Sequence, residues 1–278
     1  MATIVECLQR AAELQSISDS ARLDVELLLC RALDCQRTTL FAWPEKELSK
    51  PELESFDALL QQRLSGRPVA HLLGEREFWS LPLDVDESTL IPRPDTEVLV
   101  EAVLDLALPS DSKVLDLGTG TGAIALALAS ENPGWSLSAV DFSEAAVSLA
   151  SRNRKKCGLN NVSVYQSDWF SSVADTGFHA IVSNPPYIDE RDPHLSEGDV
   201  RFEPLSALVA GDSGFSDLQR IAEQARDYLI SGGWLLMEHG FEQGKGLRER
   251  LRLLGYQSVA TRRDYGGNER ITCGRWGG

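Results

Sequence analysis

Residues Lys113–Gly122 have the sequence KVLDLGTGTG, a short apolar stretch that runs directly into a glycine-rich loop. The first five residues have the length and composition of a buried strand, and Ala123–Ser130 continue as an apolar helix. Because Gly118, Gly120 and Gly122 lack a Cβ atom, the backbone can turn sharply there and let a ligand lie against it. Ligands of parallel sheets bind beyond the carboxyl ends of the strands, so this loop predicts a binding site.

Strand and helix predictions alternate along the rest of the chain. Further strands are expected at residues 137–141, 161–166, 180–183 and 234–237, with helices at 144–156 and from 216 onward. Residues 256–260 and 270–273 predict an antiparallel hairpin around Gly266–Gly267. Repeated strand–helix–strand units build a parallel sheet with right-handed crossovers. The sequence thus predicts the α/β class, with a doubly wound, mostly parallel seven-stranded sheet and a C-terminal antiparallel hairpin.

The first 70 residues lack strand-like alternation and predict a small all-α domain. Ser49–Glu52 (SKPE) has the pattern of a capping box with proline in the first turn, and it predicts a helix that Gly66 ends. An earlier helix is expected to begin at Ser18 or Asp19. Its predicted apolar stripe comprises Leu23, Leu27 and Cys30.

These patterns divide the chain of 278 residues into three parts. Residues 1–72 are predicted to form the helical N-terminal domain, residues 73–93 a hairpin linker and residues 94–278 the α/β domain. The linker is assigned because Phe78–Val85 has the pattern of a short hairpin. A chain of this length can bury a sizeable core without the help of disulfides or metal ions.

The charge of the chain bears on its partners. It has 27 Lys+Arg against 42 Asp+Glu, a formal net charge of −15 and a pI near 4.7. Affinity for nucleic acid comes largely from neutralising phosphates with Lys and Arg, so this balance argues against a broad nucleic-acid-binding surface. The negative charge could attract a basic protein partner over a long range. Equally, it could serve only to keep the protein soluble.

Hydropathy and cysteine content favour a soluble protein. No apolar run approaches the ~20 residues of a membrane-spanning helix, and the N-terminus lacks the core of a signal peptide. We therefore expect a cytoplasmic protein without membrane contact. The five cysteines and four histidines show no metal-ligand spacing. Reduced, mostly buried thiols and no metal site are expected.

Acidic residues lie at the ends of the first three predicted strands. Asp141, at the end of the second strand, can accept both hydrogen bonds of a ribose diol. Asp168 and Trp169, after the third strand, can meet the amino group and the ring of adenine. Asp116, in the first strand, suits a ligand with a sulfonium or ammonium cation and would repel a pyrophosphate. With the G-x-G-x-G spacing, these acids resemble the signature of S-adenosylmethionine-dependent methyltransferases. A purely structural turn is the alternative.

The segment Asn184-Pro-Pro-Tyr187 is the most specific feature of the sequence. Proline cannot donate to a sheet ladder, so two prolines in succession end the preceding strand. Each proline also holds the residue before it in extended geometry, which fixes the direction of that carbonyl. The segment therefore offers two rigid acceptors, the Asn184 side-chain oxygen and the Pro185 carbonyl, beside an aromatic wall from Tyr187.

Two such acceptors suit a planar –NH2 group. An amide nitrogen is a poor nucleophile because its lone pair is delocalised into the carbonyl group. Acceptors that grip both N–H bonds can orient the nitrogen and stabilise the positive charge that grows as a methyl group arrives. A general base is not needed before the transfer, because the nitrogen becomes acidic only afterwards. A strand-terminating loop with a packed tyrosine is the structural alternative.

Taken together, these motifs resemble the family of protein-(glutamine-N5) methyltransferases (PrmC, also called HemK). The resemblance spans nearly the whole chain. It also includes Ile91–Glu97 (IPRPDTE), Arg201–Pro204 (RFEP) and Arg263–Gly266 (RDYG). Asp95 stands where many relatives carry glutamate, which keeps the charge. The resemblance implies methylation of the glutamine in the Gly-Gly-Gln motif of peptide-chain release factors, with the helical domain helping to grip the release factor.

The resemblance also implies roles for individual residues. The predicted catalytic residues are Asn184, Pro185 and Tyr187, and the predicted substrate-binding residues are Asn184, Pro185, Pro186 and Tyr187. S-adenosylmethionine, which leaves as S-adenosylhomocysteine, is expected to contact Asp116, Gly118, Thr119, Gly120, Thr121, Gly122, Asp141, Asp168, Trp169 and Asn184. A monomer without a metal ion and without stable nucleic-acid binding is expected.

Three other functions stay open at this point. A DNA or RNA base-amino methyltransferase would use the same Asn-Pro-Pro-Tyr segment, but would need a basic groove. A dinucleotide oxidoreductase is disfavoured by the glycine spacing, and a non-enzymatic scaffold would have kept only the fold.

Several polar residues have two interpretations. Arg201 and Glu203 either order a loop over the site or are solvated. The His239 side chain, beside Glu238, is interpreted as packed or exposed rather than catalytic. The basic stretches 152–156 and 248–252 are interpreted as solvated helix faces or as contacts with a partner.

Overall fold

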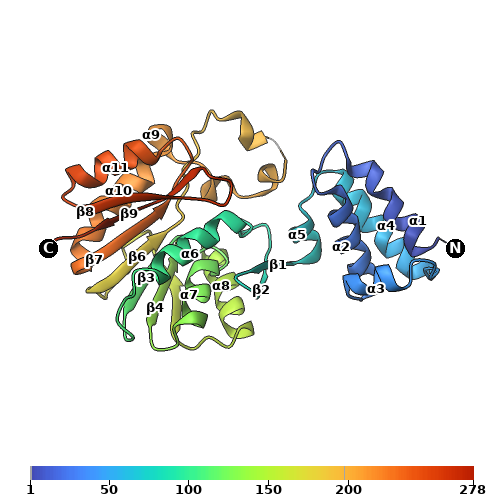
Figure 1. Cartoon of the computed structure of the whole chain (residues 1–278), viewed down its shortest axis with the longest axis horizontal. Helices are drawn as coiled ribbons and strands as arrows, with labels where there is room; N and C mark the ends of the chain where they lie inside the picture. Colours follow the sequence, from blue (N-terminus) through green and yellow to red (C-terminus); the bar gives the residue numbers. More distant parts are fainter. Residues whose placement is uncertain (1, 197) are drawn as a thin grey trace. The chain divides into compact units, whose positions relative to one another are not determined.

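The computed structural model describes residues 2–196 and 198–278, which fall into two compact units. One unit comprises Met1–Glu75 together with Pro193–Phe202, and the other comprises Arg76–Asp192 together with Glu203–Gly278. Figure 1 shows the elements of each unit in chain order. The sequence predicts that the helical domain consists of residues 1–72 alone. The second stretch of this unit, Pro193–Phe202, was therefore not predicted.

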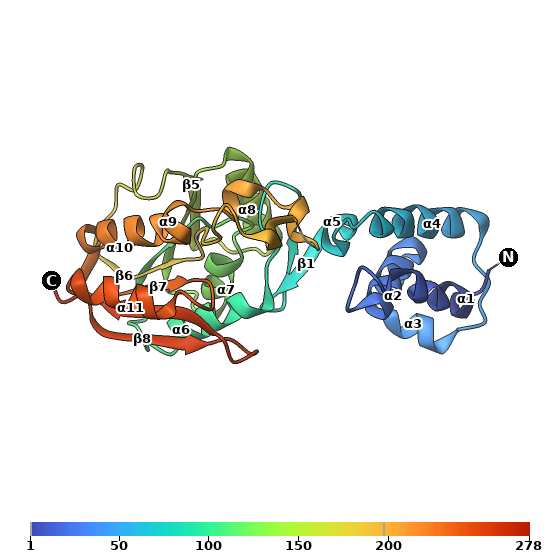
Figure 2. The same ribbon diagram turned by 90° about the horizontal axis from the view of Figure 1, so that it is seen from above.

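The first unit is helical, as the sequence predicts. It contains α1 (Ile4–Gln9), α2 (Ala21–Leu33), α3 (Arg37–Ala42), α4 (Lys50–Leu64) and α5 (Val69–Leu73), with short 3₁₀ turns at Arg10–Leu14, Pro193–Ser196 and Val200–Phe202. Helices α2 and α4 lie side by side (Figures 1 and 2). The core between these helices consists of fully buried side chains that include Ile4, Leu14, Val25, Leu28, Leu40, Phe56 and Leu60.

The predicted apolar stripe of α2 is wrong by about one position. The helix begins at Ala21 rather than after Ser18 or Asp19, and Leu23 is exposed. The buried face instead carries Ala21, Val25, Leu28, Leu29 and the carboxylate of Asp24. A charged residue on the inner face interrupts the apolar pattern from which the stripe was predicted.

Asp24 is buried because it forms an ion pair with Arg63 of α4, with Nε and Oδ2 2.8 Å apart. Both side chains are about 5% exposed. The Arg63 guanidinium also contacts Asp199, at 2.9 Å between Nη1 and Oδ1. A buried charge that loses its partner is strongly destabilising. The pairing therefore holds the stretch Pro193–Phe202 against the helices of the same unit.

The capping box at the start of α4 is confirmed. The backbone amide and the hydroxyl of Ser49 both donate to the Glu52 carboxylate, at 2.7 and 2.6 Å. These hydrogen bonds lower the pKa of Glu52 below its usual range. The box thus satisfies polar groups at the helix end that have no partner within the helix.

The capping box predicts the effect of a substitution at Ser49. Replacing Ser49 with alanine should reduce the free energy of unfolding by about 1 kcal/mol, because the side-chain part of the box is lost. Urea unfolding of the full chain, followed by far-ultraviolet circular dichroism, measures this change. The exposed neighbour Lys50 provides the control, and Lys50→Ala should change stability by less than about 0.5 kcal/mol. Equal effects of the two substitutions would contradict the role of the box.

The second unit is built on a seven-stranded sheet of order β5-β4-β3-β6-β7-β9-β8. Its strands are β3 (Lys113–Leu117), β4 (Ser136–Asp141), β5 (Val162–Gln166), β6 (Phe178–Ser183), β7 (Leu229–Glu238), β8 (Gln257–Arg263) and β9 (Glu269–Arg275). The first five are parallel, whereas β9 runs antiparallel to both β7 and β8. The predicted mostly parallel sheet and its C-terminal hairpin are confirmed.

Two layers of helices cover the sheet because its central strands are apolar on both faces. On β3, Val114 packs into the cluster with α6 (Glu97–Leu104) and α7 (Ala123–Glu131), while the next residue, Leu115, packs into the cluster with α10 (Ser216–Tyr228) and α11 (Gly244–Leu253). Figure 1 shows the sheet between these two layers. Helix α8 (Glu144–Lys156) packs beside β4 and β5, and α9 (Gly211–Gly214) precedes α10.

The predicted linker contains the expected hairpin, formed by β1 (Glu75–Phe78) and β2 (Leu81–Asp84). The five cysteines are free thiols, but the prediction that most are buried is wrong. Cys7 is buried, and the other four are partly exposed.

Candidate functional site

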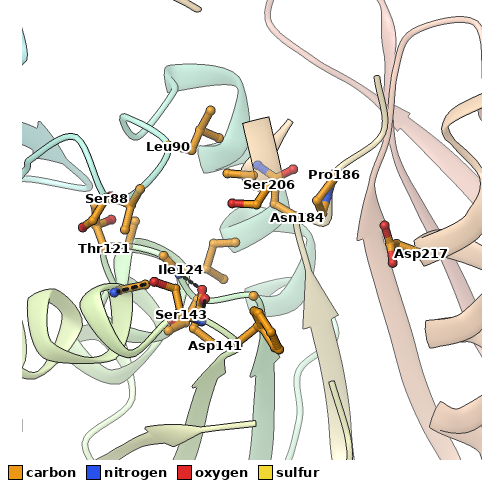
Figure 3. A pocket seen from close by; sticks show the side chains of 18 of the residues that line it. Ser88, Leu90, Thr121, Ile124, Asp141, Ser143, Asn184, Pro186, Ser206 and Asp217 are labelled. Atoms are coloured by element: carbon orange, nitrogen blue, oxygen red, sulfur yellow. Dashed lines mark hydrogen bonds between the residues drawn. The ribbon is translucent and has the colours of Figure 1, made fainter. Parts of the chain in front are cut away.

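A cavity of about 390 Å³ lies at the carboxyl ends of the central strands. The loops after β3, β4, β5 and β6 line it, together with residues 88–96 and the chain around Ser206 and Asp217. Figure 3 shows Asp141 and Ser143 on one side of the cavity and Asn184, Pro186 and Ser206 on another. The cavity therefore occupies the place where ligands bind in open α/β sheets, as the glycine loop predicts.

The glycine loop needs its glycines for two reasons. Gly118 has a φ of +70°, and a Cβ there would lie 3.4 Å from the ring of Trp169. Gly122 has a φ of +88° at the start of α7, and a Cβ there would lie 3.1 Å from Leu126. Left-handed backbone and close packing thus combine at this turn. Gly118, Thr119, Gly120 and Thr121 line the cavity, whereas Gly122 lies behind it.

Asp116 is fully buried beneath this loop and does not line the cavity. Its Oδ2 accepts hydrogen bonds from the Thr119 hydroxyl at 2.7 Å and the Ala125 amide at 3.3 Å. Burial raises the pKa of Asp116 to about 7. The observed contacts give Asp116 a part in holding the loop, and direct contact with a ligand stays a prediction.

Asp141 lines the cavity at the end of β4. Its two carboxylate oxygens accept hydrogen bonds from the backbone amides of Gly120 and Ser143, each at 2.9 Å. Burial raises the pKa of this carboxyl above its ordinary value, while the backbone hydrogen bonds oppose the rise. One side chain thus joins the glycine loop to the start of α8.

Asp168 and Trp169 also line the cavity, after β5. Asp168 forms a two-point ion pair with Arg220 of α10, at 3.0 and 3.1 Å. Trp169 has a φ of +50°, which turns the chain at this point. Asp217, one turn before Arg220, lines the cavity as well, and burial raises its pKa. Asp217 and Arg220 were not predicted from the sequence. They are three residues apart in the first turns of α10, so they lie on the same face of that helix, and this spacing is the signal that could have indicated them.

The Asn-Pro-Pro-Tyr segment leaves β6 and forms a corner of the cavity. Asn184 and Pro186 line the cavity, whereas Pro185 and Tyr187 do not. The Asn184 amide group donates a hydrogen bond from Nδ2 to the Thr96 hydroxyl at 3.4 Å. The expectation that Tyr187 forms an aromatic wall stays a prediction, since its ring packs with the apolar cluster around α10.

The Tyr187 residue is held at both of its polar ends. Its hydroxyl donates to Glu238 Oε1 at 3.4 Å, and its carbonyl accepts from Gln243 Nε2 at 3.1 Å. Burial and the neighbouring Glu238 carboxylate raise the pKa of Tyr187 well above its ordinary value. A Cβ on Gly214 would lie 2.1 Å from the Tyr187 carbonyl oxygen, so this corner is packed tightly from behind.

The motif Ile91–Glu97 brings Arg93 to the cavity. Arg93 forms an ion pair with Glu203, whose side chain is fully buried. Of the two interpretations of Glu203, the ordering of a loop beside the site agrees with this pairing. Arg201 instead donates to the Ser65 carbonyl at 3.1 Å in the helical unit.

Within residues 2–196 and 198–278, no group of three or more His, Cys, Asp or Glu side chains is placed to hold a metal ion. In the same part of the chain, no helix is long and apolar enough to cross a membrane.

Comparison with known proteins agrees with this geometry. The family model described as PrmC N-terminal domain matches residues 6–74, and the model described as Methyltransferase small domain matches residues 94–198. The chain is 58% identical to the release factor glutamine methyltransferase of Shewanella oneidensis, over 99% of this chain and 96% of that protein. It is 54% identical to the protein of the same name from Escherichia coli, over 97% of each chain.

Among solved structures, a methyltransferase from Pyrococcus furiosus has a similar fold, with a TM-score of 0.55 at 21% identity. The match covers 80% of this chain and 99% of that one.

Proposed function

Because the chain belongs to the release factor glutamine methyltransferases, we propose that it methylates the N5 nitrogen of the glutamine in the Gly-Gly-Gln motif of peptide-chain release factors. S-adenosylmethionine is the proposed methyl donor. The observation that carries the proposal is the shared cavity. Asn184 of the Asn-Pro-Pro-Tyr segment lines the same cavity as the glycine loop and Asp141.

The cavity fits S-adenosylmethionine in size and charge. Its volume of about 390 Å³ lies within the range of small-molecule sites. Asp141, Asp168 and Asp217 line it together with Arg93 and Arg220. Because Asp168 is paired with Arg220, Asp141 and Asp217 are the carboxylates that suit a ligand with a sulfonium and an ammonium group. Trp169 and the exposed ring of Phe142 offer apolar surface for the nucleoside. Asp141 would hold the ribose, and the glycine loop would lie against the rest of the ligand.

The chain supplies positioning and electrostatics for the transfer. When bound, S-adenosylmethionine would supply an electrophilic methyl group, whose bond to sulfur breaks so that S-adenosylhomocysteine is left. The Asn184 oxygen and the Pro185 carbonyl would accept hydrogen bonds from the two N–H groups of the glutamine amide. These two hydrogen bonds would orient the amide nitrogen toward that methyl group. The same acceptors stabilise the positive charge that develops on the nitrogen. The nitrogen then loses a proton to water, and the product is N5-methylglutamine.

The helical unit is the proposed site of release-factor recognition. The lining residues of the cavity all belong to the second unit. The acidic net charge of −15 suits a basic partner. A monomer in the cytoplasm is proposed, and the stretches 152–156 and 248–252 are further candidates for contact with the partner.

The proposal predicts a specific product. The purified protein, incubated with S-adenosylmethionine and an unmethylated release factor, should add one methyl group to the Gly-Gly-Gln peptide. Mass spectrometry of the digested release factor measures the addition and locates it on the glutamine. A release factor with Gly-Gly-Asn in place of Gly-Gly-Gln is the matched control and should stay unmodified. An unchanged Gly-Gly-Gln peptide would contradict the proposal.

A further inference from the structure

Behind the Asn-Pro-Pro-Tyr corner lies a buried carboxylate, Glu238, at the end of β7. Strands β6 and β7 are paired in parallel with Ser183 opposite Met237, so Asn184 and Glu238 are the next residues along neighbouring strands. Glu238 is 2% exposed and Thr96 is 5% exposed. A buried charge costs free energy unless it is hydrogen-bonded or paired. This position therefore calls for an explanation beyond packing.

The groups around Glu238 come from three other segments of the chain. The Tyr187 hydroxyl donates to Oε1 at 3.4 Å. Burial raises the pKa of Glu238 to about 7, while a hydrogen bond from Thr96 and the charge of Arg270 on β9 oppose the rise and Asp95 adds to it. Arg270 is itself paired with Asp264 at 3.0 Å. In its ionised form Glu238 can only accept hydrogen bonds.

A further hydrogen bond links Thr96 to the Asn-Pro-Pro-Tyr corner. The Thr96 oxygen accepts a hydrogen bond from Asn184 Nδ2 at 3.4 Å. A hydroxyl that accepts in this way has its own proton free to donate elsewhere. The Glu238 carboxylate is the neighbouring acceptor, and its buried Oε2 has no hydrogen-bond partner among residues 2–196 and 198–278, so it is available to that proton. An asparagine side chain whose Nδ2 is held by Thr96 must turn its Oδ1 the other way.

We propose that Thr96 and Glu238 are positioning residues that fix which end of the Asn184 amide faces the bound glutamine. Glu238 accepts a hydrogen bond from the Thr96 hydroxyl, the Thr96 oxygen accepts one from Asn184 Nδ2, and the Asn184 oxygen is left to accept from the substrate. Without this chain the amide can rotate by 180° and present Nδ2, a donor, to the –NH2 group of the glutamine. The inference rests on the proposed function, because it assumes that the substrate group is a donor.

Substitutions at Thr96 test the inference with a closely matched pair. Thr96→Val keeps the shape but removes the hydroxyl, whereas Thr96→Ser keeps the hydroxyl. At pH 8, Thr96→Val should lower kcat at least about 10-fold and Thr96→Ser less than about 3-fold, since misorienting one preorganised contact costs part of its catalytic effect. The Kd of S-adenosylmethionine, measured by calorimetry, should change less than about 3-fold in both variants.

Glu238→Gln tests the other half of the chain. The glutamine amide is similar in shape to the carboxylate, but it can also donate a hydrogen bond to the Thr96 oxygen. The Thr96 hydroxyl is then no longer required to donate toward position 238 and to accept from Asn184. We expect kcat to fall at least about 10-fold, and the Thr96→Val/Glu238→Gln double variant to be no slower than the slower single variant, because both act through one chain. Glu249→Gln on the exposed side of α11 is the matched control and should keep the parent kcat.

The outcomes separate the inference from the proposed function. A parent protein that fails to methylate the release factor overturns the proposed function. If the parent is active, parent-like kcat in Thr96→Val or Glu238→Gln overturns the inference. Equal losses in Thr96→Val and Thr96→Ser also overturn it, because they would show a role in packing alone.

Discussion

Replacing Asn184 with alanine is expected to lower kcat about 10³-fold and to change the Kd of S-adenosylmethionine less than about 3-fold. Asn184 lines the cavity at the end of β6. Its side-chain oxygen is the proposed acceptor for the nitrogen that gains positive charge, so its contact strengthens during the transfer. An interaction that strengthens in the transition state affects kcat more than ground-state binding.

Single-turnover methylation of the release factor measures kcat for this variant, and calorimetry measures the cofactor Kd. Asn160→Ala is the matched control, since Asn160 is exposed in the turn before β5 and does not line the cavity. It should keep parent values for both quantities. A variant Asn184→Ala that loses cofactor affinity but keeps kcat would reverse the role assigned to Asn184.

The second large effect is expected at Asp141. Asp141→Ala should raise the Kd of S-adenosylmethionine about 10- to 100-fold, because a buried acceptor that serves two backbone amides is lost together with the proposed ribose contact. The amides of Gly120 and Ser143 would each lose a partner at 2.9 Å. At saturating cofactor, kcat should stay within about 5-fold of the parent value.

Calorimetric titration with S-adenosylmethionine measures the effect at Asp141. Asp111→Ala serves as the control, because Asp111 is exposed in the turn before β3. Identical kinetic profiles for Asn184→Ala and Asp141→Ala would show that the division between methyl transfer and cofactor binding is wrong.

The sheet could be predicted well from the sequence, for a physical reason. Its central strands are buried on both faces, so they appear as short apolar runs, and glycines or prolines mark their ends. Strand β3 matches its prediction at both ends, as does α8. The start of β7 could not be predicted in the same way. This strand begins at Leu229, before Gly232 and Gly233, and the glycines interrupt the apolar run that would mark it.

The residues around the site could be predicted where they lie in one continuous motif or, like Asp141, at the end of a predicted strand. The glycine loop and Asn184–Tyr187 are motifs of this kind. Thr96 lies in the motif Ile91–Glu97, but nothing in that motif indicates that it meets Asn184. Asp217 and Arg220 reach the site from α10, where no motif marks them. The same reason explains the error in α2, where Asp24 is buried because Arg63 lies opposite it.

The stretch Pro193–Phe202 has a consequence for how the protein can be divided. The polypeptide passes from one unit to the other three times, after residues 75, 192 and 202. A fragment that starts at Arg76 would contain every residue of the cavity but would leave these ten residues without the helices that hold Asp199. They join Asp192 to Glu203, which pairs with Arg93. Cutting the chain once therefore does not yield two independent modules.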